Sequence, residues 1–535
     1  MAPVEAGNPA QGSASARGGA AAAAMVAAGI LLSRIAGLIR DRVFAHFFGN
    51  SDAADAFRAA FRIPNFLQNL FGEGVLSASF IPVYARLRAE REDERAAEVA
   101  EAIFALLFLV TTLLVGLGIF ATPWLIDAIA PGFQGAKREL TIRLVRILFP
   151  GAGLLVFSAW CLGILNSHRK FFLSYVAPVI WNVTLIAALL WRGGHVPSSR
   201  LTEILAWASV VGSGLQFAMQ LPVVFRFLWP LRLRLGAGVA EQVRRVLRSF
   251  GPVFVARGVV QISAYIDSLL ASFLPTGAVA ALSYAQTIYL LPVSLFGMSV
   301  SAAELPAMSS ATGSQEEIAK ALRERLANGL ERIAFFVVPS AAAFVVLGHV
   351  VVATLYRSGV FAAKDVTYVW GVLAGSSVGL LASTFGRLYS SAFYALRDTR
   401  TPLKFAVIRV MLTLGLGYVC ALPLPPLLGI DPKWGVAGLT LSAGIAGWIE
   451  FGLLRRSLVG RIGRPAFAMA LVGKLWLAAL IAAALGLALW RASASLHPLL
   501  TGAVVLVPYC LVYLLLTRWM GIATGAEALR VLRRR

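Results

Sequence analysis

Long apolar segments, separated by short polar or Pro/Gly-rich connections, recur along almost the whole chain. A bilayer core of about 30 Å needs about 20 apolar residues per helix. Fourteen segments of this kind can be counted. None shows the period-two alternation of a membrane β-strand. The pattern therefore predicts an all-α polytopic membrane protein with about 14 transmembrane helices, at 24–48, 57–86, 99–122, 141–166, 172–192, 201–228, 247–274, 279–308, 330–356, 368–395, 403–423, 434–455, 467–490 and 498–518.

Composition supports this class. The 535 residues are 59% hydrophobic, with a mean hydropathy of +0.77. Only 14% are charged, against roughly 25% in soluble domains. The net charge of +22 could indicate nucleic-acid binding, but the Lys and Arg of the connections are concentrated in alternate loops such as "ARLRAERE" and "RDTRTPLK" rather than in a soluble domain. The positive-inside rule makes these loops cytoplasmic and, with an even number of spans, both termini too. We expect these charges to contact anionic membrane lipids.

A weak internal repeat suggests how the helices are organised. The stretch "FRIPNFLQNLFGEGVLSASFIP" is similar to "YLLPVSLFGMSVSAAELP", each with a Pro, a Phe-Gly and a second Pro. Parallel repeats build two lobes around a central site in several transporters, although apolar helices with Gly and Pro can also look alike by chance. We therefore expect two pseudo-symmetric lobes around a central cavity.

The expected domains follow the loops and the changes in composition. Residues 1–22 are rich in Ala, Gly and Ser and are predicted to be a disordered tail, with no cleaved signal peptide. The other predicted parts are an N-lobe of spans 1–6 at 23–228, a second lobe of spans 7–11 at 229–423 with a cytoplasmic linker at 229–246, C-terminal helices of spans 12–14 at 424–518, and a basic cytoplasmic tail at 519–535.

The first two predicted spans contain an unusual number of charges. Arg34 and Asp41 are seven residues apart and share one helix face, while Asp55, Arg58 and Arg62 follow one another at i+3 and i+4. Charges at the centre of a span cost roughly 2.5–3.5 kcal/mol on insertion scales, so they normally face the bundle interior or a wet cavity. The planar fork of Arg matches phosphate oxygens. The two stripes predict a cationic pocket for an anionic substrate.

Two other interpretations of these charges remain open. Arg40, Asp41 and Arg42 could instead extend to the extracytoplasmic surface, or pair with Asp52 and Asp55 across a tight hairpin. Further charges in later spans are as compatible with helix-end anchors as with ligand contacts: Arg257, Asp267, Glu304, Arg387, Arg409, Glu450 and Lys474.

Enzyme and metal signatures are missing from the sequence. It contains no G-x-x-x-x-G-K-[ST] loop and no H-E-x-x-H, and its five His are scattered. Cys161, Cys420 and Cys510 have no disulfide or metal spacing. We therefore expect a transporter without a cofactor, with coupling to a monovalent ion left open. An inside-negative potential would favour outward movement of an anion by about 2.3 kcal/mol per charge per 100 mV.

Three motifs carry a resemblance to a known family. "SRIAGLIRD" followed by "FFG", then "DAFRAAFRIPNFLQNLFGEGVLSASFIPVY", and later "FYALRDTRTPLK", resemble the MurJ/MviN lipid II flippases of the multidrug/oligosaccharidyl-lipid/polysaccharide exporter superfamily. The likeness runs from about residue 25 to about residue 518. It implies binding of an undecaprenyl-diphosphate-linked peptidoglycan precursor in a central cationic cavity, and its release outside by alternating access.

The resemblance also assigns candidate residues. Ser33, Arg34, Arg40 and Asp41 match the first-span motif, Asp55 matches the Asp that opens span two, and Glu73 matches the Glu of [AG]-E-G. With the charge stripes, the expected substrate-binding residues are Arg34, Arg40, Asp41, Asp55, Arg58, Arg62, Gln68 and Arg257. The expected conformational or gating residues are Ser33, Gly72, Glu73, Gly74 and Thr287.

Two departures from the family pattern concern the cargo. Gln68 stands where the family commonly has an Arg, and Gln286-Thr287 stands where it typically has Asp-Arg. Arg58, Arg62 or Arg257 could supply the missing charge. Transport of a lipid-linked saccharide is therefore a safer expectation than lipid II itself.

Rival functions remain at this stage. Within transport, they are a flippase for another polyprenyl-diphosphate-linked saccharide and a drug/ion antiporter. Outside transport, a membrane glycosyltransferase or ligase would need acids in a sizeable extracytoplasmic loop, whereas Asp127, Glu139 and Asp431 are isolated. A monomer is expected because no coiled-coil or dimer motif is present, and cell-wall synthesis proteins are candidate partners.

Overall fold

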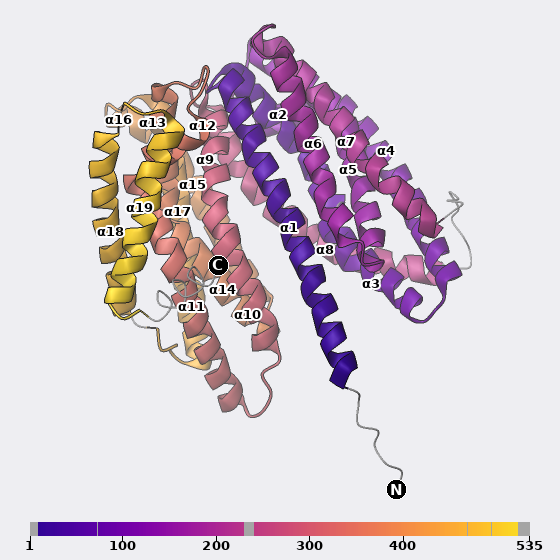
Figure 1. The fold of residues 1–535 in the computed structure, drawn as a ribbon. Helices are drawn as coiled ribbons and strands as arrows, with labels where there is room; N and C mark the ends of the chain where they lie inside the picture. Colours follow the sequence, from indigo (N-terminus) through magenta and orange to yellow (C-terminus); the bar gives the residue numbers. More distant parts are fainter. Residues whose placement is uncertain (1–8, 72, 229–239, 468, 494, 523–535) are drawn as a thin grey trace. The chain divides into compact units, whose positions relative to one another are not determined.

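The computed structural model describes residues 9–71, 73–228, 240–467, 469–493 and 495–522. Within these ranges the structure is helical apart from short turns and one isolated β-bridge between Ser358 and Phe361 (Figure 1). The all-α prediction is confirmed.

The chain divides into two compact units. Unit 1 comprises Met1–Phe47 and Ala56–Tyr265, and unit 2 comprises Phe48–Asp55 and Ile266–Arg535. The chain therefore passes from one unit to the other three times: on either side of the short loop at 49–51, and again between Tyr265 and Ile266. The sequence analysis placed the boundary in the linker 229–246, whose residues 229–239 lie outside the described ranges.

The first eight helices, coloured indigo to magenta in Figure 1, provide most of unit 1. They are α1 (Pro9–Phe48), α2 (Asp52–Phe71), α3 (Glu73–Ala89), α4 (Asp93–Ile129), α5 (Gly135–Ser167), α6 (Phe171–Arg192), α7 (Ser198–Leu228) and α8 (Ala240–Ser272). Helix α1 begins at Pro9, so residues 9–22 are helical where the sequence analysis expected disorder. Alanine, which dominates the end of this stretch, has the highest helix propensity.

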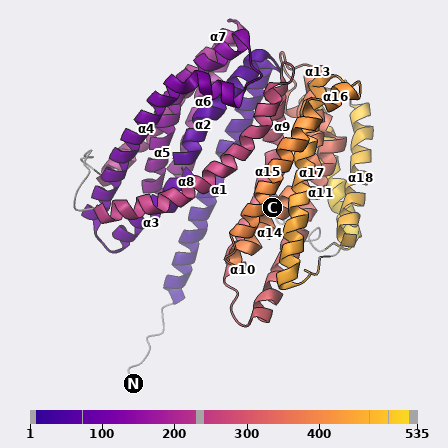
Figure 2. The ribbon, with the colours of Figure 1, turned by 180° about the vertical axis from the view of Figure 1, so that it is seen from behind.

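The remaining helices belong to unit 2, and Figure 2 shows α10, α14, α15 and α17 of this unit from behind. The elements are α9 (Ala278–Pro292), the π-helix η2 (Val293–Met298), α10 (Ser299–Ser309), α11 (Gln315–Val346), α12 (Gly348–Tyr356), α13 (Ala363–Ser377), α14 (Leu380–Ala395), α15 (Arg400–Ala421), α16 (Leu424–Leu427), the 3-10 helix η3 (Pro432–Trp434), α17 (Gly435–Ile462), α18 (Met469–Ala492) and α19 (Pro498–Trp519).

Each of the fourteen predicted spans coincides with one helix or with consecutive helices. By length and hydropathy, 10 described stretches could cross a membrane, and the pair α13 and α14, bent by 41°, makes an eleventh. The other three predicted spans correspond to α1, α2 with α3, and α8. In α2 the four charges at Asp52, Asp55, Arg58 and Arg62 interrupt the apolar pattern within 20 residues.

Close helix contacts in both units depend on small residues. In unit 1, a Cβ at Gly212 of α7 would lie 3.2 Å from the Cα of Trp181 in α6. In unit 2, a Cβ at Gly379 would lie 2.6 Å from the Cα of Gly444 in α17. Such close approach at small residues is the usual basis of helix packing in membranes, because the hydrophobic effect contributes little to helix association within the lipid.

The loop between α1 and α2 is fixed in unit 2 through the N-terminus of α9. The Asp55 carboxylate accepts hydrogen bonds from the backbone N–H groups of Gly277, at 2.8 Å, and Ala280, at 2.7 Å. The Tyr284 hydroxyl donates to the Gly49 carbonyl at 3.1 Å. A carboxylate at a helix N-terminus satisfies otherwise unpaired N–H groups and complements the helix dipole. Asp55 therefore anchors this loop, a role that the sequence did not predict.

The turn between α14 and α15 contains the "RDTRTPLK" motif and is fixed by Asp398. Its carboxylate accepts hydrogen bonds from the backbone N–H and the hydroxyl of Thr401, at 3.0 and 2.7 Å, and pairs with Arg461 of α17 at 2.8 Å. The Thr401 bonds, followed by the Arg461 guanidinium, lower the pKa of Asp398 from 3.8 to about 2. Since the folded state favours the charged form, this contribution to stability is complete above about pH 4 and is lost as the pH falls toward about 2.

Replacing Asp55 with Ala should lower the melting temperature of the purified protein by several degrees. The change leaves the N–H groups of Gly277 and Ala280 buried without an acceptor, which costs about 1–3 kcal/mol. The exposed Asp52, which accepts a hydrogen bond from the Thr276 hydroxyl at 3.0 Å, is the matched control. Asp52→Ala should change the melting temperature much less, and equal effects of the two variants would contradict the capping role.

The Asp398→Asn variant should be less stable than the wild type at about pH 7, because it loses the charge that Arg461 and Thr401 stabilise. The difference in melting temperature between the two proteins should shrink at about pH 3, where the wild-type carboxylate begins to protonate. A difference of the same size at both pH values would show that the charge of Asp398 does not stabilise the fold.

Candidate substrate-binding site

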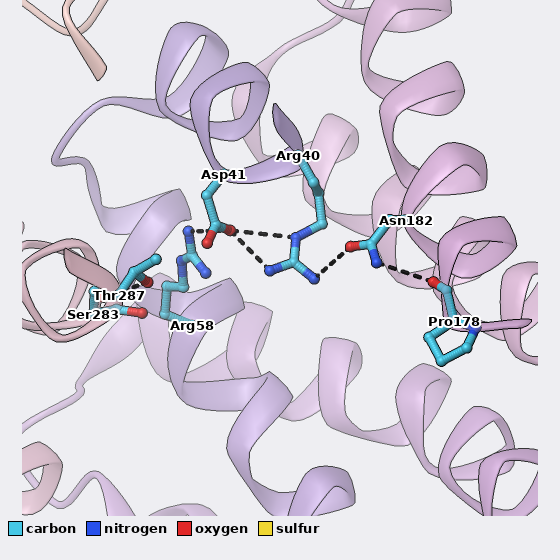
Figure 3. Close-up of polar contacts among 7 residues, drawn as sticks. All are labelled: Arg40, Asp41, Arg58, Pro178, Asn182, Ser283 and Thr287. Carbon is cyan, nitrogen blue, oxygen red and sulfur yellow. Dashed lines mark hydrogen bonds and ion pairs between the residues drawn. The ribbon is translucent and has the colours of Figure 1, made fainter. Parts of the chain in front are cut away.

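A cluster of two arginines around one aspartate lies in unit 1, between α1 and α2 (Figure 3). Arg40 donates to Asp41 Oδ1 through Nη2 at 3.0 Å and through Nε at 3.3 Å. Arg58 donates to the same oxygen through Nη2 at 3.2 Å. We call Arg40, Asp41 and Arg58 the cationic cluster. Charged side chains of the first two helices therefore meet in this cluster.

Helix α6 orients one side of the cluster. The Asn182 side-chain amide donates to the Pro178 carbonyl at 2.9 Å, which directs its oxygen toward Arg40 (Figure 3). Arg40 Nη1 donates to this oxygen at 3.1 Å. The guanidinium of Arg40 also lies over the Trp181 ring, 5.1 Å from its centroid. Arg40 is therefore held by an anion, an amide and an aromatic face.

The other side of the cluster packs against an aromatic ring of α1. The guanidinium carbon of Arg58 lies 4.4 Å from the centroid of the Phe44 ring. A cation over an aromatic face gains about 0.5–2 kcal/mol, with the larger values in desolvated sites. Because each guanidinium group lies over an aromatic ring, its N–H groups point outward along its edge and can donate hydrogen bonds there.

The charges of the cluster do not balance. The exposed fractions of the side chains are 22% for Arg40, 13% for Arg58 and 5% for Asp41. Within these three residues, one carboxylate oxygen is shared by two guanidinium groups in a poorly solvated place. Two guanidinium groups held close together are chemically suited to bind a further anion. Guanidinium forks bind phosphate oxygens especially well.

The sequence did not single out the α6 side chains of this site. Asn182 and Trp181 occur in the stretch "VIWNVTL" of a predicted span. An amide within an apolar span is a weak signal, because such residues often bond only to their own helix. Nothing in the order of residues shows that α6 lies beside α1.

Three further predicted substrate-binding residues have other surroundings in unit 1. Arg34 is exposed and Gln68 is half-buried. The backbone carbonyl of Arg62 accepts a hydrogen bond from the Tyr265 hydroxyl at 2.5 Å. Their roles in binding, like that of Asp55, stay predictions. The side chain of Arg257 lies outside the described part of the structure.

The predicted gating residues are only partly described. Ser33 is half-buried in α1. The Thr287 hydroxyl donates to the Ser283 carbonyl within α9 at 3.0 Å (Figure 3). Gly72 lies outside the described residues, and the structure does not describe the side chain of Glu73 or the burial of Gly74.

Some of the later intramembrane charges have protein partners. Arg409 of α15 pairs with Glu450 of α17 at 3.0 Å. Glu304 of α10 faces Arg325 and Arg332 of α11 at 3.7 and 3.8 Å. These ion pairs connect neighbouring helices of unit 2, as expected for charges in a membrane. Among the described residues, no group of three or more His, Cys, Asp or Glu could hold a metal ion.

Comparisons with known proteins agree on one family. The family described as lipid II flippase MurJ matches residues 44–510. A lipid II flippase MurJ of Burkholderia cenocepacia is 33% identical over 434 residues, which cover 79% of this chain and 80% of the relative. A probable lipid II flippase MurJ of Rhizobium meliloti is 31% identical over 527 residues, which cover 96% of this chain and 95% of the relative.

Solved structures give the same result for the fold. A lipid II flippase MurJ in an inward closed conformation has a TM-score of 0.74 and 25% identity, and the match covers 92% of this chain and 98% of that one. An inward-facing multidrug resistance MATE family transporter of the MOP superfamily has a TM-score of 0.63 at 19% identity, covering 80% and 95%. The second likeness concerns the fold alone. Together the sequence matches show that this chain belongs to the lipid II flippase MurJ family.

Proposed function

We propose that this protein is a transporter that moves lipid II from the cytoplasmic to the outer leaflet of the inner membrane by alternating access. Membership of the family supports the cargo class, and the apolar helices support a multi-pass membrane protein. The cationic cluster is the observation that carries the mechanism, because it places two guanidinium groups around one carboxylate oxygen, where a phosphate could take the place of that oxygen. Its product would serve peptidoglycan synthesis, cell wall biogenesis and cell shape.

In this mechanism the diphosphate of the cargo replaces part of the bonding that Asp41 gives to the arginines. Arg40 and Arg58 turn donors from the shared carboxylate oxygen toward phosphate oxygens, while Asn182 and the aromatic rings hold the guanidinium planes. When the cargo leaves, Asp41 again takes up both arginines. The carboxylate thereby stabilises the empty site and competes with the bound lipid, which aids release.

Other residues complete the proposal. Arg34, Arg62 and Arg257 add positive charge along the path of the cargo, and Gln68 contributes a neutral amide. Ser33, Gly72, Glu73, Gly74 and Thr287 belong to the segments that change conformation. Both termini and the arginine-rich loops face the cytoplasm, according to the positive-inside rule. The membrane potential favours export of the anion, with a monovalent ion as an optional co-substrate.

A second cargo is favoured by one specific observation. Gln68 and Thr287 stand where the resembling family commonly has an arginine, so fewer fixed cations would surround the headgroup. Another polyprenyl-diphosphate-linked saccharide would use the same cluster, because the diphosphate is common to all such lipids. Competition between lipid II and other lipid-linked diphosphates for the purified protein separates the two cargoes.

Replacing Arg58 with Gln should abolish rescue of a flippase-depleted cell and weaken lipid II binding by about 10–100-fold. This estimate follows from the loss of one charge-assisted hydrogen bond of about 1.5–3 kcal/mol. Arg58→Lys keeps the positive charge but loses the planar pair of guanidinium donors, and should bind lipid II with intermediate affinity. The control is Arg200→Gln, which removes an arginine that is 66% exposed and pairs with Glu203 at 2.6 Å in the same unit. Full rescue by Arg58→Gln would contradict the proposed role.

Replacing Asp41 with Asn should destabilise the empty protein and increase its stabilisation by lipid II. Without the carboxylate, Arg40 and Arg58 face each other with no shared anion, which the cargo diphosphate then supplies. The measurement is the rise in melting temperature on adding lipid II, which should be larger for Asp41→Asn than for the wild type. An equal or smaller rise would show that Asp41 and the cargo do not compete for the arginines.

A further inference from the structure

Unit 2 contains a cavity of about 930 Å³ whose lining includes no residue of the cationic cluster. It is lined by residues of α11, α14, α17, α18 and the linker between α17 and α18. Its size falls in the range of about 300–1,000 Å³ that is usual for ligand pockets. Neither the proposed diphosphate site nor any predicted gating residue uses it.

The walls of the cavity are strongly aromatic. They include Phe385 and Tyr389 of α14, Trp448 and Phe451 of α17, and Trp476 of α18. Flat, rigid side chains of this kind give a large apolar contact area at little cost in conformational entropy. The body of the cavity therefore fits an acyl chain better than a polar solute.

Three arginines line the same cavity. Arg455 and Arg456 belong to the C-terminal part of α17, and Arg464 belongs to the linker that follows this helix. All three are exposed, and none forms an ion pair with a carboxylate in the described ranges 9–71, 73–228, 240–467, 469–493 and 495–522. The carboxylate of Asp398 near this end of α17 is already paired with Arg461 at 2.8 Å.

The cavity thus combines aromatic walls with three exposed arginines that form no ion pair with a carboxylate of the described residues. We infer that it binds an anionic glycerophospholipid of the surrounding bilayer, with the phosphate at Arg455, Arg456 and Arg464 and an acyl chain against the aromatic walls. Basic pockets between membrane helices are typical sites for anionic headgroups. Such a lipid would fill the space between α17 and α18 and connect their linker to α11 and α14. This site is separate from the cargo site and does not depend on the proposed transport function.

The headgroup contact is tested with the full chain in detergent, titrated with phosphatidylglycerol or with phosphatidylcholine of the same chains. Native mass spectrometry counts the lipid molecules bound to each protein. The triple variant Arg455→Gln, Arg456→Gln, Arg464→Gln should bind phosphatidylglycerol about 100-fold more weakly at one site, since each basic residue contributes about one factor of five. Phosphatidylcholine should bind weakly to both proteins.

A matched triple variant controls for the loss of charge. Arg244, Arg248 and Arg518 are also exposed and do not line the cavity. Replacing these three with Gln removes the same net charge and should leave the affinity for phosphatidylglycerol unchanged. If both triple variants lose the lipid equally, the effect is one of general charge and the site is disproved.

The chain contact is tested by filling the cavity. Gly452 lines the cavity, and a Cβ there would meet nothing within 4 Å. Gly452→Phe should therefore fold, place a ring in the cavity and remove the bound phosphatidylglycerol while all three arginines remain. Gly460 lies on the same helix, has the same free space around its Cβ and does not line the cavity, so Gly460→Phe should retain the lipid.

Two outcomes would overturn the inference even if a lipid is found. Equal retention of phosphatidylcholine and phosphatidylglycerol would show an apolar groove without headgroup recognition. Displacement of phosphatidylglycerol by undecaprenyl diphosphate, one molecule for one, would show that the cavity belongs to the path of the cargo. Because rescue of a flippase-depleted cell is measured separately, failure of this inference is distinguishable from failure of the proposed function.

Discussion

The sharing of one carboxylate by two guanidinium groups is the interaction on which the functional account depends. Asp41 accepts hydrogen bonds from Arg40 and Arg58 through the same oxygen, so the two arginines share this carboxylate. A complete ion pair would have little reason to exchange its partner, whereas an arginine alone in an apolar helix would be costly to bury. The shared arrangement lies between these limits. It keeps the charges inside the protein and leaves them able to bind an anion.

The surrounding helices restrict how this arrangement can change. Asn182 and Trp181 hold Arg40 from α6, while the loop after α1 is fixed to α9 by Asp55. Helices α1 and α2 therefore carry the charges in unit 1 and are anchored in unit 2 at the turn between them. The capping bonds of Asp55 thereby hold the turn that joins the two charge-bearing helices.

The sequence predicted most of the fold because a membrane imposes length and polarity on every span. The fourteen apolar segments correspond to helices. The pairing of Asp41 with Arg40 and Arg58 does not follow from helical spacing, because Arg40 is its chain neighbour and Arg58 belongs to the next helix. The contacts that bring distant helices together could not be predicted in this way. Asn182 is 142 positions from Arg40, and Asp55 is 222 positions from Gly277. Asp55 lies three residues before Arg58 and so shares a helix face with it, which made it look like a binding residue in the sequence. Its capping role follows only from the position of α9.

Photo-crosslinking at position 181 tests the central claim most directly. Trp181 contacts the guanidinium of Arg40, so a benzophenone amino acid in its place should form a covalent adduct with lipid II under light. The same group in place of Trp207, an exposed residue of α7 in the same unit, should not. An adduct at position 181 alone is the predicted result. Adducts of equal yield at both positions, or none at position 181, would contradict a cargo diphosphate bound at the cationic cluster.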